Sequence, residues 1–89
     1  MGIAVDELGG KIYWSDDQAG IYYNIRRANL DGSNCETIIH GTHHQPFDLT
    51  VSLHDIYWSD LIYNAIWKMP KDPVVGEQPT KIYHYKDGR

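Results

Sequence analysis

The sequence lacks several features that define common protein classes. It contains a single cysteine, Cys35, so no disulfide can form within the chain. No stretch approaches the ~18 consecutive apolar residues that span a bilayer, and we expect no direct membrane insertion by these residues. The N-terminus also lacks the basic and apolar regions of a signal peptide. Met1 adjoins a predicted strand instead, which suggests that the sequence is a segment of a longer chain.

Positive charge is also scarce. The chain has 8 Lys and Arg residues against 12 Asp and Glu residues, a formal net charge of −4 and an isoelectric point near 5.6. Binding to nucleic acid or to an anionic membrane relies on concentrated Lys and Arg side chains. The sequence shows no such basic cluster, so the composition argues against nucleic acid as a partner.

Helical periodicity is absent over any useful length, whereas aromatic residues are plentiful. The chain contains 7 Tyr, 3 Trp and 1 Phe residues among its 89 residues. Links rich in turn-forming residues, such as Gly9-Gly10 and Asp31-Gly32, separate short runs of β-branched and aromatic residues. This composition predicts an all-β protein.

The pentapeptide Ile-Tyr-Trp-Ser-Asp occurs twice, at residues 12–16 and 56–60, which are 44 positions apart. Each copy follows a short strand-like run and precedes two more. The basic residues Arg27 and Lys68 correspond to one another, and the first unit has three more residues in its middle connection, as expected for a loop insertion. The chain therefore comprises two four-stranded units, residues 1–45 and 46–89.

Repeats of 40 to 45 residues with four strands each are typical of propeller blades. Each blade packs face to face between two others, so that a central strand covered on both faces can be continuously apolar. This accounts for Ile-Tyr-Trp. We expect Ile12 and Trp14 to face one neighbour, and Tyr13 and Ser15 to face the other.

The motif and its surroundings resemble the YWTD (LDL-receptor class B) repeat of the low-density lipoprotein receptor family. The residues that carry the resemblance are Ile-Tyr-Trp-Ser-Asp, the segment from Ile25 to Asn34, and Pro46-Phe47-Asp48-Leu49-Thr50-Val51 before the second copy. Ser15 and Ser59 replace the usual Thr and keep its hydroxyl. The resemblance covers essentially the whole chain. The second copy departs from the pattern at Lys68-Met69-Pro70-Lys71, where the Asn-Leu-Asp-Gly turn is missing.

This resemblance implies a six-bladed β-propeller, of which two antiparallel blades are present here as a fragment. It also implies a receptor, placed on the extracellular side of the plasma membrane or in the endosomal lumen as part of a larger membrane protein. The implied partners are the remaining blades, an EGF-like module and an extracellular protein ligand. Insect cell-surface proteins with these repeats are the suggested parents. Two blades alone leave two apolar faces uncovered, so the isolated chain is expected to fold poorly or to self-associate.

The motif residues are interpreted as structural, and they are Tyr13, Trp14, Ser15, Asp16, Tyr57, Trp58, Ser59 and Asp60. Asp16 and Asp60 also invite a reading as calcium ligands or as a catalytic pair. Calcium needs six to eight oxygen ligands, and the sequence contains no Asp-x-Asp-x-Asp-Gly loop. An Asp at a strand end can instead accept N–H groups of a loop or pair with an Arg of the adjoining blade. No metal or other cofactor is expected.

Two function classes remain open. The first is a non-catalytic, extracellular protein-binding module. The alternative is a fragment of a calcium-dependent propeller hydrolase of the lactonase or gluconolactonase type, because those enzymes resemble the segment from Ile3 to Asp16. No grouping of Cys, His and acidic residues indicates a nucleophilic site. The repeated Trp and the segment Arg27 to Ser33 favour the binding module, which is not an enzyme.

Two further features have more than one interpretation. His40, His43 and His44 fall in one connection, where they form either a solvated loop or a pH sensor, and their spacing is a weak match to a metal site. Cys35 follows the Asn-Leu-Asp-Gly turn. In a secreted module such a Cys has a partner outside these residues or is buried as a small apolar side chain.

Replacing His40, His43 and His44 together by Gln tests the pH-sensing interpretation. These side chains gain positive charge between pH 7.4 and about 5.5, because an unperturbed His has a pKa near 6.5. We expect the triple variant of the complete ectodomain to lose the pH dependence of ligand or inter-domain affinity. Unchanged pH dependence would assign these residues to a solvated loop.

Overall fold

A computed structural model describes residues 2–17, 22–42, 46–60 and 65–84 of the chain. These residues form two antiparallel sheets of four strands, in the orders β1-β2-β3-β4 and β5-β6-β7-β8. The strands are β1 (Ile3–Asp6), β2 (Lys11–Asp17), β3 (Tyr22–Asn29), β4 (Glu36–Thr42), β5 (Pro46–Val51), β6 (Asp55–Asp60), β7 (Ala65–Pro70) and β8 (Thr80–His84). The described ranges contain no helix. The predicted all-β class with two four-stranded blades is confirmed.

The two sheets have the same internal register. The motif lies on the second strand of each sheet, where Tyr13 pairs with Arg27 and Tyr57 pairs with Lys68. The predicted correspondence of Arg27 and Lys68 is therefore confirmed. Asp16 pairs with residue 24 and Asp60 pairs with residue 65, so the three extra residues of the first unit lie between its second and third strands.

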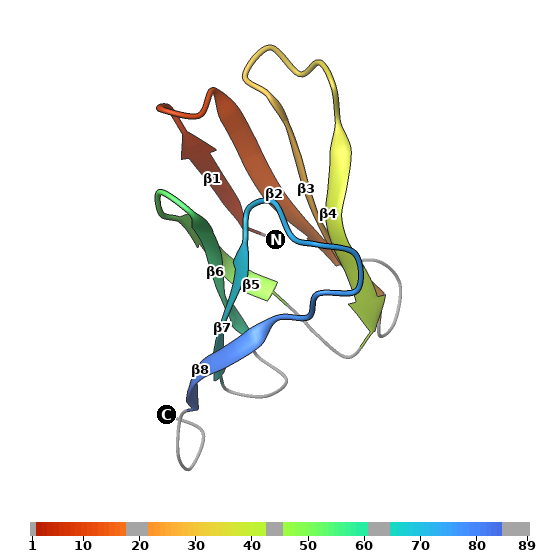
Figure 1. Cartoon of the computed structure of the whole chain (residues 1–89), viewed down its shortest axis with the longest axis vertical. Coiled ribbons are helices and arrows are strands. Elements are labelled where there is room, and N and C mark those ends of the chain that lie inside the picture. The colour runs from red at the N-terminus through yellow and green to blue at the C-terminus, as the bar shows by residue number, and fades with distance from the viewer. Residues whose placement is uncertain (1, 18–21, 43–45, 61–64, 85–89) are drawn as a thin grey trace.

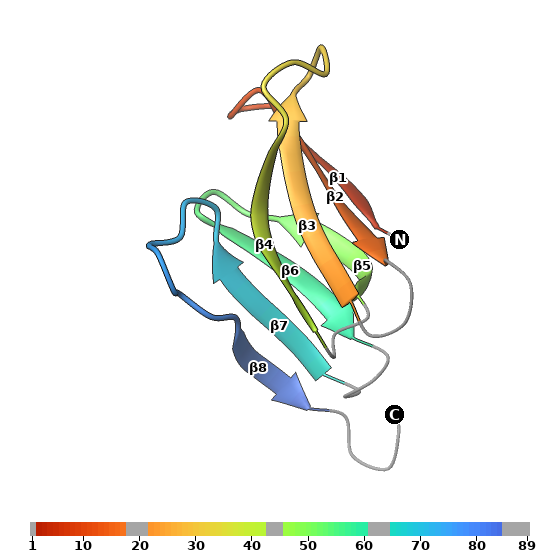
Figure 2. The same ribbon diagram turned by 90° about the vertical axis from the view of Figure 1, so that its right-hand side faces the viewer.

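The two sheets meet at the side of their first strands. Strand β5 contacts both β1 and β2, and these are the principal contacts between the sheets. Figure 1 shows that β4 and β8, the last strand of each sheet, lie far from one another. The sheets therefore form a wedge, as neighbouring blades do when their first strands lie nearest the propeller axis. Figure 2 shows the two sheets from the side, and Figure 1 shows the connection between β7 and β8 extending toward β4.

The hydrophobic core fills the space between the two sheets. The first sheet contributes Tyr13 and Ile25 to it. The second sheet contributes Leu49, Ile56, Trp58 and Met69. Two of these six side chains, Tyr13 and Trp58, are aromatic, and a buried aromatic side chain removes roughly 150–250 Å² of surface from water. At ~25 cal/mol per Å², the contact between the sheets is a major term in the stability of the chain.

The motif strands place alternate residues on opposite faces of their sheets. In β2, Tyr13 and Ser15 are buried against the second sheet, whereas Ile12 and Trp14 point the other way and are half-buried. The predicted division of these residues between two faces is confirmed. In β6 the buried set is the opposite one, because this strand turns its Ile and Trp toward the first sheet. The two copies of the motif therefore face one another through opposite sides of their strands, with Tyr13 on the first and Ile56 and Trp58 on the second.

The tight turns use the residues that their backbone requires. Gly10 in the turn before β2 has φ +68°, and Gly32 in the turn before β4 has φ +88°. Side chains other than Asn and Asp are disfavoured at such angles, so Gly supplies them at the least cost. The predicted turns at Gly9-Gly10 and Asp31-Gly32 are confirmed.

The different burial of the two motif tryptophans predicts different mutational effects. Trp58 is only 1% exposed, and Trp58→Ala should lower the free energy of unfolding by ~3–5 kcal/mol, as expected for a buried large aromatic residue. Trp14 is half-buried, so Trp14→Ala in the same 89-residue chain should cost about 1–2 kcal/mol. Urea denaturation monitored by circular dichroism measures both. Equal losses would contradict this arrangement of the two faces.

Candidate functional site: the blade junction and the turn groove

The motif serines form hydrogen bonds with the backbone of the first strand of each blade, or with the residue that precedes it. In the first blade, the Gly2 N–H donates to Ser15 Oγ at 2.8 Å, and the Ser15 N–H donates to the Gly2 carbonyl at 2.9 Å. In the second blade, the Asp48 N–H donates to Ser59 Oγ at 3.3 Å. A hydroxyl is needed at both positions to accept these bonds. Ser therefore serves where the related repeats carry Thr.

The motif aspartates lie in unlike surroundings. Asp60 is 2% exposed at the end of β6 and lies close to Tyr23 of the first blade. Burial raises the pKa of the Tyr23 hydroxyl to about 12, and the negative charge of Asp60 adds to this shift. Asp16, at the same position of the first motif, is half-buried on the uncovered face of its sheet. Asp60 thus contributes to the junction between the blades, as a structural motif residue would.

Arg27 is the main polar link between the blades. Its Nη1 donates to Tyr13 Oη at 3.3 Å and to the Lys71 carbonyl at 3.0 Å. Its Nη2 pairs with Asp72 Oδ1 at 2.8 Å and with Glu36 Oε1 at 2.6 Å. The guanidinium carries five N–H donors in a rigid fork, so one side chain can bind a strand, a turn and the next blade together. Arg27 therefore holds the second blade against the motif tyrosine of the first.

Lys71 and Asp6 form a second link. Lys71 Nζ lies 2.6 Å from Asp6 Oδ2, and both side chains are nearly buried. The hydrogen bond from Lys71 lowers the pKa of the Asp6 carboxyl below its ordinary value of 3.8, and a bond from the Gly9 N–H acts in the same direction. The Asp6 carboxyl is therefore ionised at neutral pH and bonded to the Lys71 side chain, and charge-assisted bonds of this kind are strong.

These two ionic links could not be predicted from the sequence. The partners are 45 and 65 positions apart, and no local pattern relates them. The only signal was the departure of the second repeat at residues 68–71, which we interpreted as the loss of a turn. In the structure, this departing segment supplies Lys71 and, next to it, Asp72.

A groove between two turns forms a second candidate site. Strand β1 contributes Val5, the turn from β1 to β2 contributes Leu8, and the turn from β5 to β6 contributes Leu53. Leu8 is 93% exposed and Leu53 is 70% exposed. These residues line a hollow of about 400 Å³, which we call the turn groove. Its lining also includes Asp6, Glu7, Val51 and Ser52. Apolar side chains that gather on a surface with a polar rim are typical of protein-binding sites.

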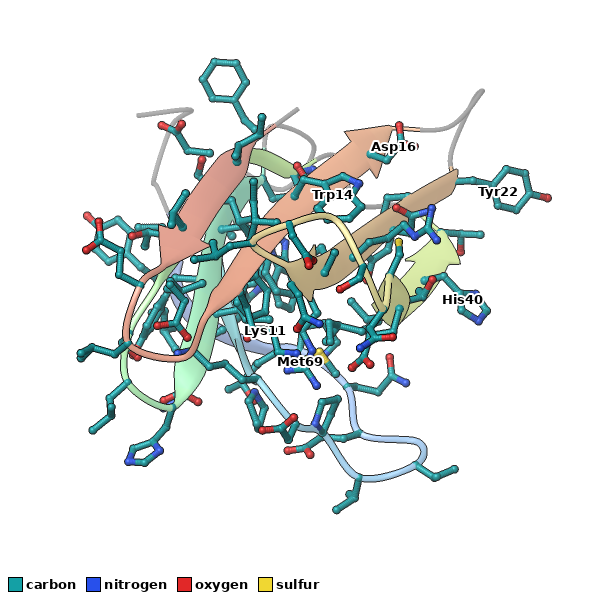
Figure 3. The ribbon with its side chains drawn as sticks, turned by 90° about the horizontal axis from the view of Figure 1, so that it is seen from above. Lys11, Trp14, Asp16, Tyr22, His40 and Met69 are labelled. Atoms are coloured by element: carbon teal, nitrogen blue, oxygen red, sulfur yellow. The ribbon has the colours of Figure 1, made fainter. Side chains whose placement is uncertain are left out.

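The remaining residues predicted as possible sites are His40, His43, His44 and Cys35. His40 is exposed on β4, and Figure 3 shows it at the far edge of the first sheet from Trp14. It does not line the turn groove, but it lines a hollow between the blades together with Met69 of the core and residues 73–78. His43 and His44 lie outside the described residues, so the pH-sensing hypothesis stays a prediction. Cys35 is exposed, which rules out its interpretation as a buried apolar side chain.

Among the described residues, no cluster of three or more His, Cys, Asp or Glu residues is placed to hold a metal ion. Within them, no helix has the length and apolar character needed to cross a bilayer.

The fold and the repeated motif define a pair of propeller-type blades. Residues 10–51, from the start of β2 to the end of β5, match the family model of the low-density lipoprotein receptor repeat class B. Residues 10–51 therefore form a repeat of this family, as the resemblance of the motif implied. The match lies mainly in the first blade, and the second blade repeats the same pentapeptide on its equivalent strand.

Several insect proteins are similar to the chain. Protein cueball of Drosophila persimilis is 42% identical over 79 residues, which cover 89% of this chain and 12% of that protein. Protein cueball of Drosophila grimshawi is 37% identical over 81 residues, with 91% of this chain and 13% of that protein covered. Protein cueball of Drosophila virilis is 35% identical over 95 residues, with 97% and 15% covered. The chain thus spans between 12% and 15% of the length of these relatives.

The Asp6–Lys71 pair predicts how stability responds to acid. Because the folded pKa of Asp6 is lowered, its contribution is present above about pH 4 and is lost as the pH falls through that lowered pKa. At pH 7, Asp6→Asn should cost about 1–3 kcal/mol, since it leaves the nearly buried Lys71 ammonium without its carboxylate. Near pH 2 the cost should shrink. Urea denaturation at both pH values measures the difference.

The control for this prediction is the double variant with Asp6→Asn and Lys71→Met, which removes both charges. It should recover part of the stability lost at pH 7, because no unpaired ammonium remains. An equal cost of Asp6→Asn at both pH values would show that the pair contributes nothing to the junction.

Proposed function

We propose that the chain is part of a non-catalytic, extracellular propeller module that binds a protein ligand through the turn groove. The observation that carries this proposal is the exposure of Leu8 and Leu53 on equivalent turns of the two blades. Blade faces are occupied by packing when blades stack, whereas turns at the end of the sheets remain accessible whichever blade stands next. Exposed loops on a rigid scaffold are the usual place for binding residues.

The groups within the motif support a structural use over a catalytic one. The Ser15 and Ser59 hydroxyls accept bonds that fasten a strand, and Asp60 is buried at the junction. The Tyr13 hydroxyl accepts a bond from Arg27. The family repeat is a module that is typically non-catalytic and extracellular, which agrees with both parts of the proposal.

The chemistry of the turn groove indicates the kind of ligand. Its lining combines apolar side chains, among them Leu8 and Leu53, with the carboxylates of Asp6 and Glu7. Such a surface fits a protein that presents apolar side chains beside a basic residue. The proposed ligand is accordingly a secreted or cell-surface protein with that feature.

The test compares the unchanged chain with a double variant that carries both Leu8→Ser and Leu53→Ser. Both are immobilised at low density and screened against arrayed Drosophila secreted and cell-surface ectodomains. We expect ligands of the unchanged chain to bind the double variant at least tenfold more weakly. Val75→Ser is the matched control, because Val75 is fully exposed on the connection between β7 and β8, outside the groove. The Val75→Ser variant should bind the same ligands as tightly as the unchanged chain does.

Two outcomes would contradict the proposal. Ligands that bind the double variant and the unchanged chain equally would place binding elsewhere. Calcium-dependent hydrolysis of a panel of γ- and δ-lactones by the folded chain would support the hydrolase alternative.

A further inference from the structure

A second hollow lies beside the turn groove. It has a volume of about 240 Å³, and Asp6 and Leu53 line both hollows. We call it the polar pocket, and its polar lining side chains are Asp6, Lys11, Tyr13, Arg27, Lys71 and Asp72. The first four belong to the first blade and the last two to the second blade. The polar pocket therefore lies at the junction between the blades and not on the outer face of either sheet.

One positive charge in the polar pocket lacks an acidic partner. Arg27 pairs with one of the two lining carboxylates, and Lys71 pairs with the other. Lys11 Nζ instead donates to the neutral Asn29 Oδ1 at 2.6 Å. No carboxylate forms an ion pair with Lys11 among the described residues. An anion that enters the polar pocket therefore finds an ammonium group whose charge is not already neutralised by a contact.

The unused hydrogen-bonding capacity of the polar pocket consists mainly of donors. A Lys ammonium has three N–H donors, and Lys11 and Lys71 each use one of them within the described ranges. The Tyr13 hydroxyl accepts a bond from Arg27, so its own O–H group can donate. Tyr13 is 1% exposed and Lys71 is 9% exposed. Because buried donors without acceptors are unfavourable, an anion with two oxygen acceptors fits this lining.

Arg27 orients the polar pocket without binding the anion. Its Nε donates to Glu36 Oε1, and its Nη2 pairs with Asp72. Its Nη1 donates to Tyr13 Oη and to the Lys71 carbonyl. These bonds occupy the guanidinium donors, and the bond to Tyr13 directs the hydroxyl proton away from Arg27. The groups left to contact an anion are the Tyr13 hydroxyl and the two ammonium groups.

The position of the polar pocket indicates where the anion comes from. Glu7 lines only the turn groove, Lys11 lines only the polar pocket, and Leu53 lines both. A ligand segment with an apolar side chain against Leu53 therefore has a carboxylate of this chain on one side and an ammonium on the other. An Asp or Glu residue of that segment can place its carboxylate in the polar pocket while the apolar side chain occupies the turn groove.

From these observations we infer that the polar pocket binds a carboxylate side chain of the ligand protein, through the Lys11 ammonium and the Tyr13 hydroxyl. The inference rests on the proposed binding of a protein ligand at the turn groove. It adds a rule for recognition, because the ligand then presents an acidic residue on one side of its apolar residue and a basic residue on the other. Charge complementarity of this kind selects among ligands that share the same apolar side chain.

Capped peptides that contain one Leu and one Glu test the inference with the full 89-residue chain. The two residues are separated by none, one, two or three Ala residues, in both orders, and each peptide has a counterpart with Gln in place of Glu. Affinities are measured from the shifts of backbone amide signals in NMR titrations. We expect at least one Glu peptide to bind about tenfold more tightly than its Gln counterpart. The net charge of −4 opposes an acidic peptide, so this preference reports a local contact.

Lys11→Gln should abolish the preference for Glu, because it removes the charge but keeps a donor for Asn29. Lys11→Arg keeps the charge and should retain most of the preference. Lys81→Gln is the matched control, since it removes the same charge from an exposed Lys that lies over Trp67, outside the polar pocket. It should leave the preference unchanged. Circular dichroism of each variant shows whether the sheets are intact.

The outcomes separate this inference from the proposed function. The double variant with Leu8→Ser and Leu53→Ser should weaken the Glu and Gln peptides by the same factor, because both lose the contact with the apolar side chain. If it weakens neither peptide while the preference for Glu persists and depends on Lys11, the proposed function is wrong and the carboxylate site stands. Glu peptides that bind no more tightly than Gln peptides at any spacing overturn the inference, as do Glu peptides with no measurable binding. A preference that survives Lys11→Gln overturns it as well.

Discussion

The packing of Trp58 against the side of the first sheet that carries Tyr13 is the contact on which the rest of this structure depends. A single four-stranded sheet leaves two apolar faces in water, and neither sheet has a helix or a second layer of its own among the described residues. Only stacking removes a face from solvent. The core is therefore shared between the blades, and each blade is stable to the extent that another one covers it.

Polar contacts then set how the two sheets are joined. Apolar packing is non-directional, and it would tolerate several angles between two flat surfaces. Arg27 reaches the backbone and side chain of the segment after β7, while Lys71 of that segment reaches back to the turn after β1. These bonds lie at one end of the sheets and are directional. They select one arrangement among those that the core alone would permit.

The groups that stabilise the blades differ from the exposed side chains of the turn groove. The chemically distinctive groups of the motif, its hydroxyls and its second carboxylate, are used within and between blades. The tips of two turns take no part in the links between the blades, since Leu8 and Leu53 are 93% and 70% exposed. A propeller module of this kind can therefore vary the tips of its turns without disturbing its core. Leu8 and Leu53 lie where such variation is tolerated.

The fold was largely predictable from sequence, because the residues that specify each blade lie close together in the chain and the same pattern occurs in both blades. The doubled pentapeptide, its period and the turn residues Gly10 and Gly32 each specify geometry within one blade, and the structure confirms the strands, the two faces of β2 and the equivalence of Arg27 with Lys68. Hydrophobic alternation reports which side chains share a face, since neighbours on a strand point in opposite directions.

Only the tertiary structure decided which face is covered and what lies across the junction. Trp14 and Trp58 have the same local sequence, yet one is half-buried and the other fully buried, because burial depends on which blade stands beside each sheet. The pairing of Asp6 with Lys71 was equally invisible, since it joins a regular turn to the one segment where the repeat is irregular. Sequence alone determined the blade and its motif; the contact between blades determined the buried core, the ionic links and the surfaces that remain exposed.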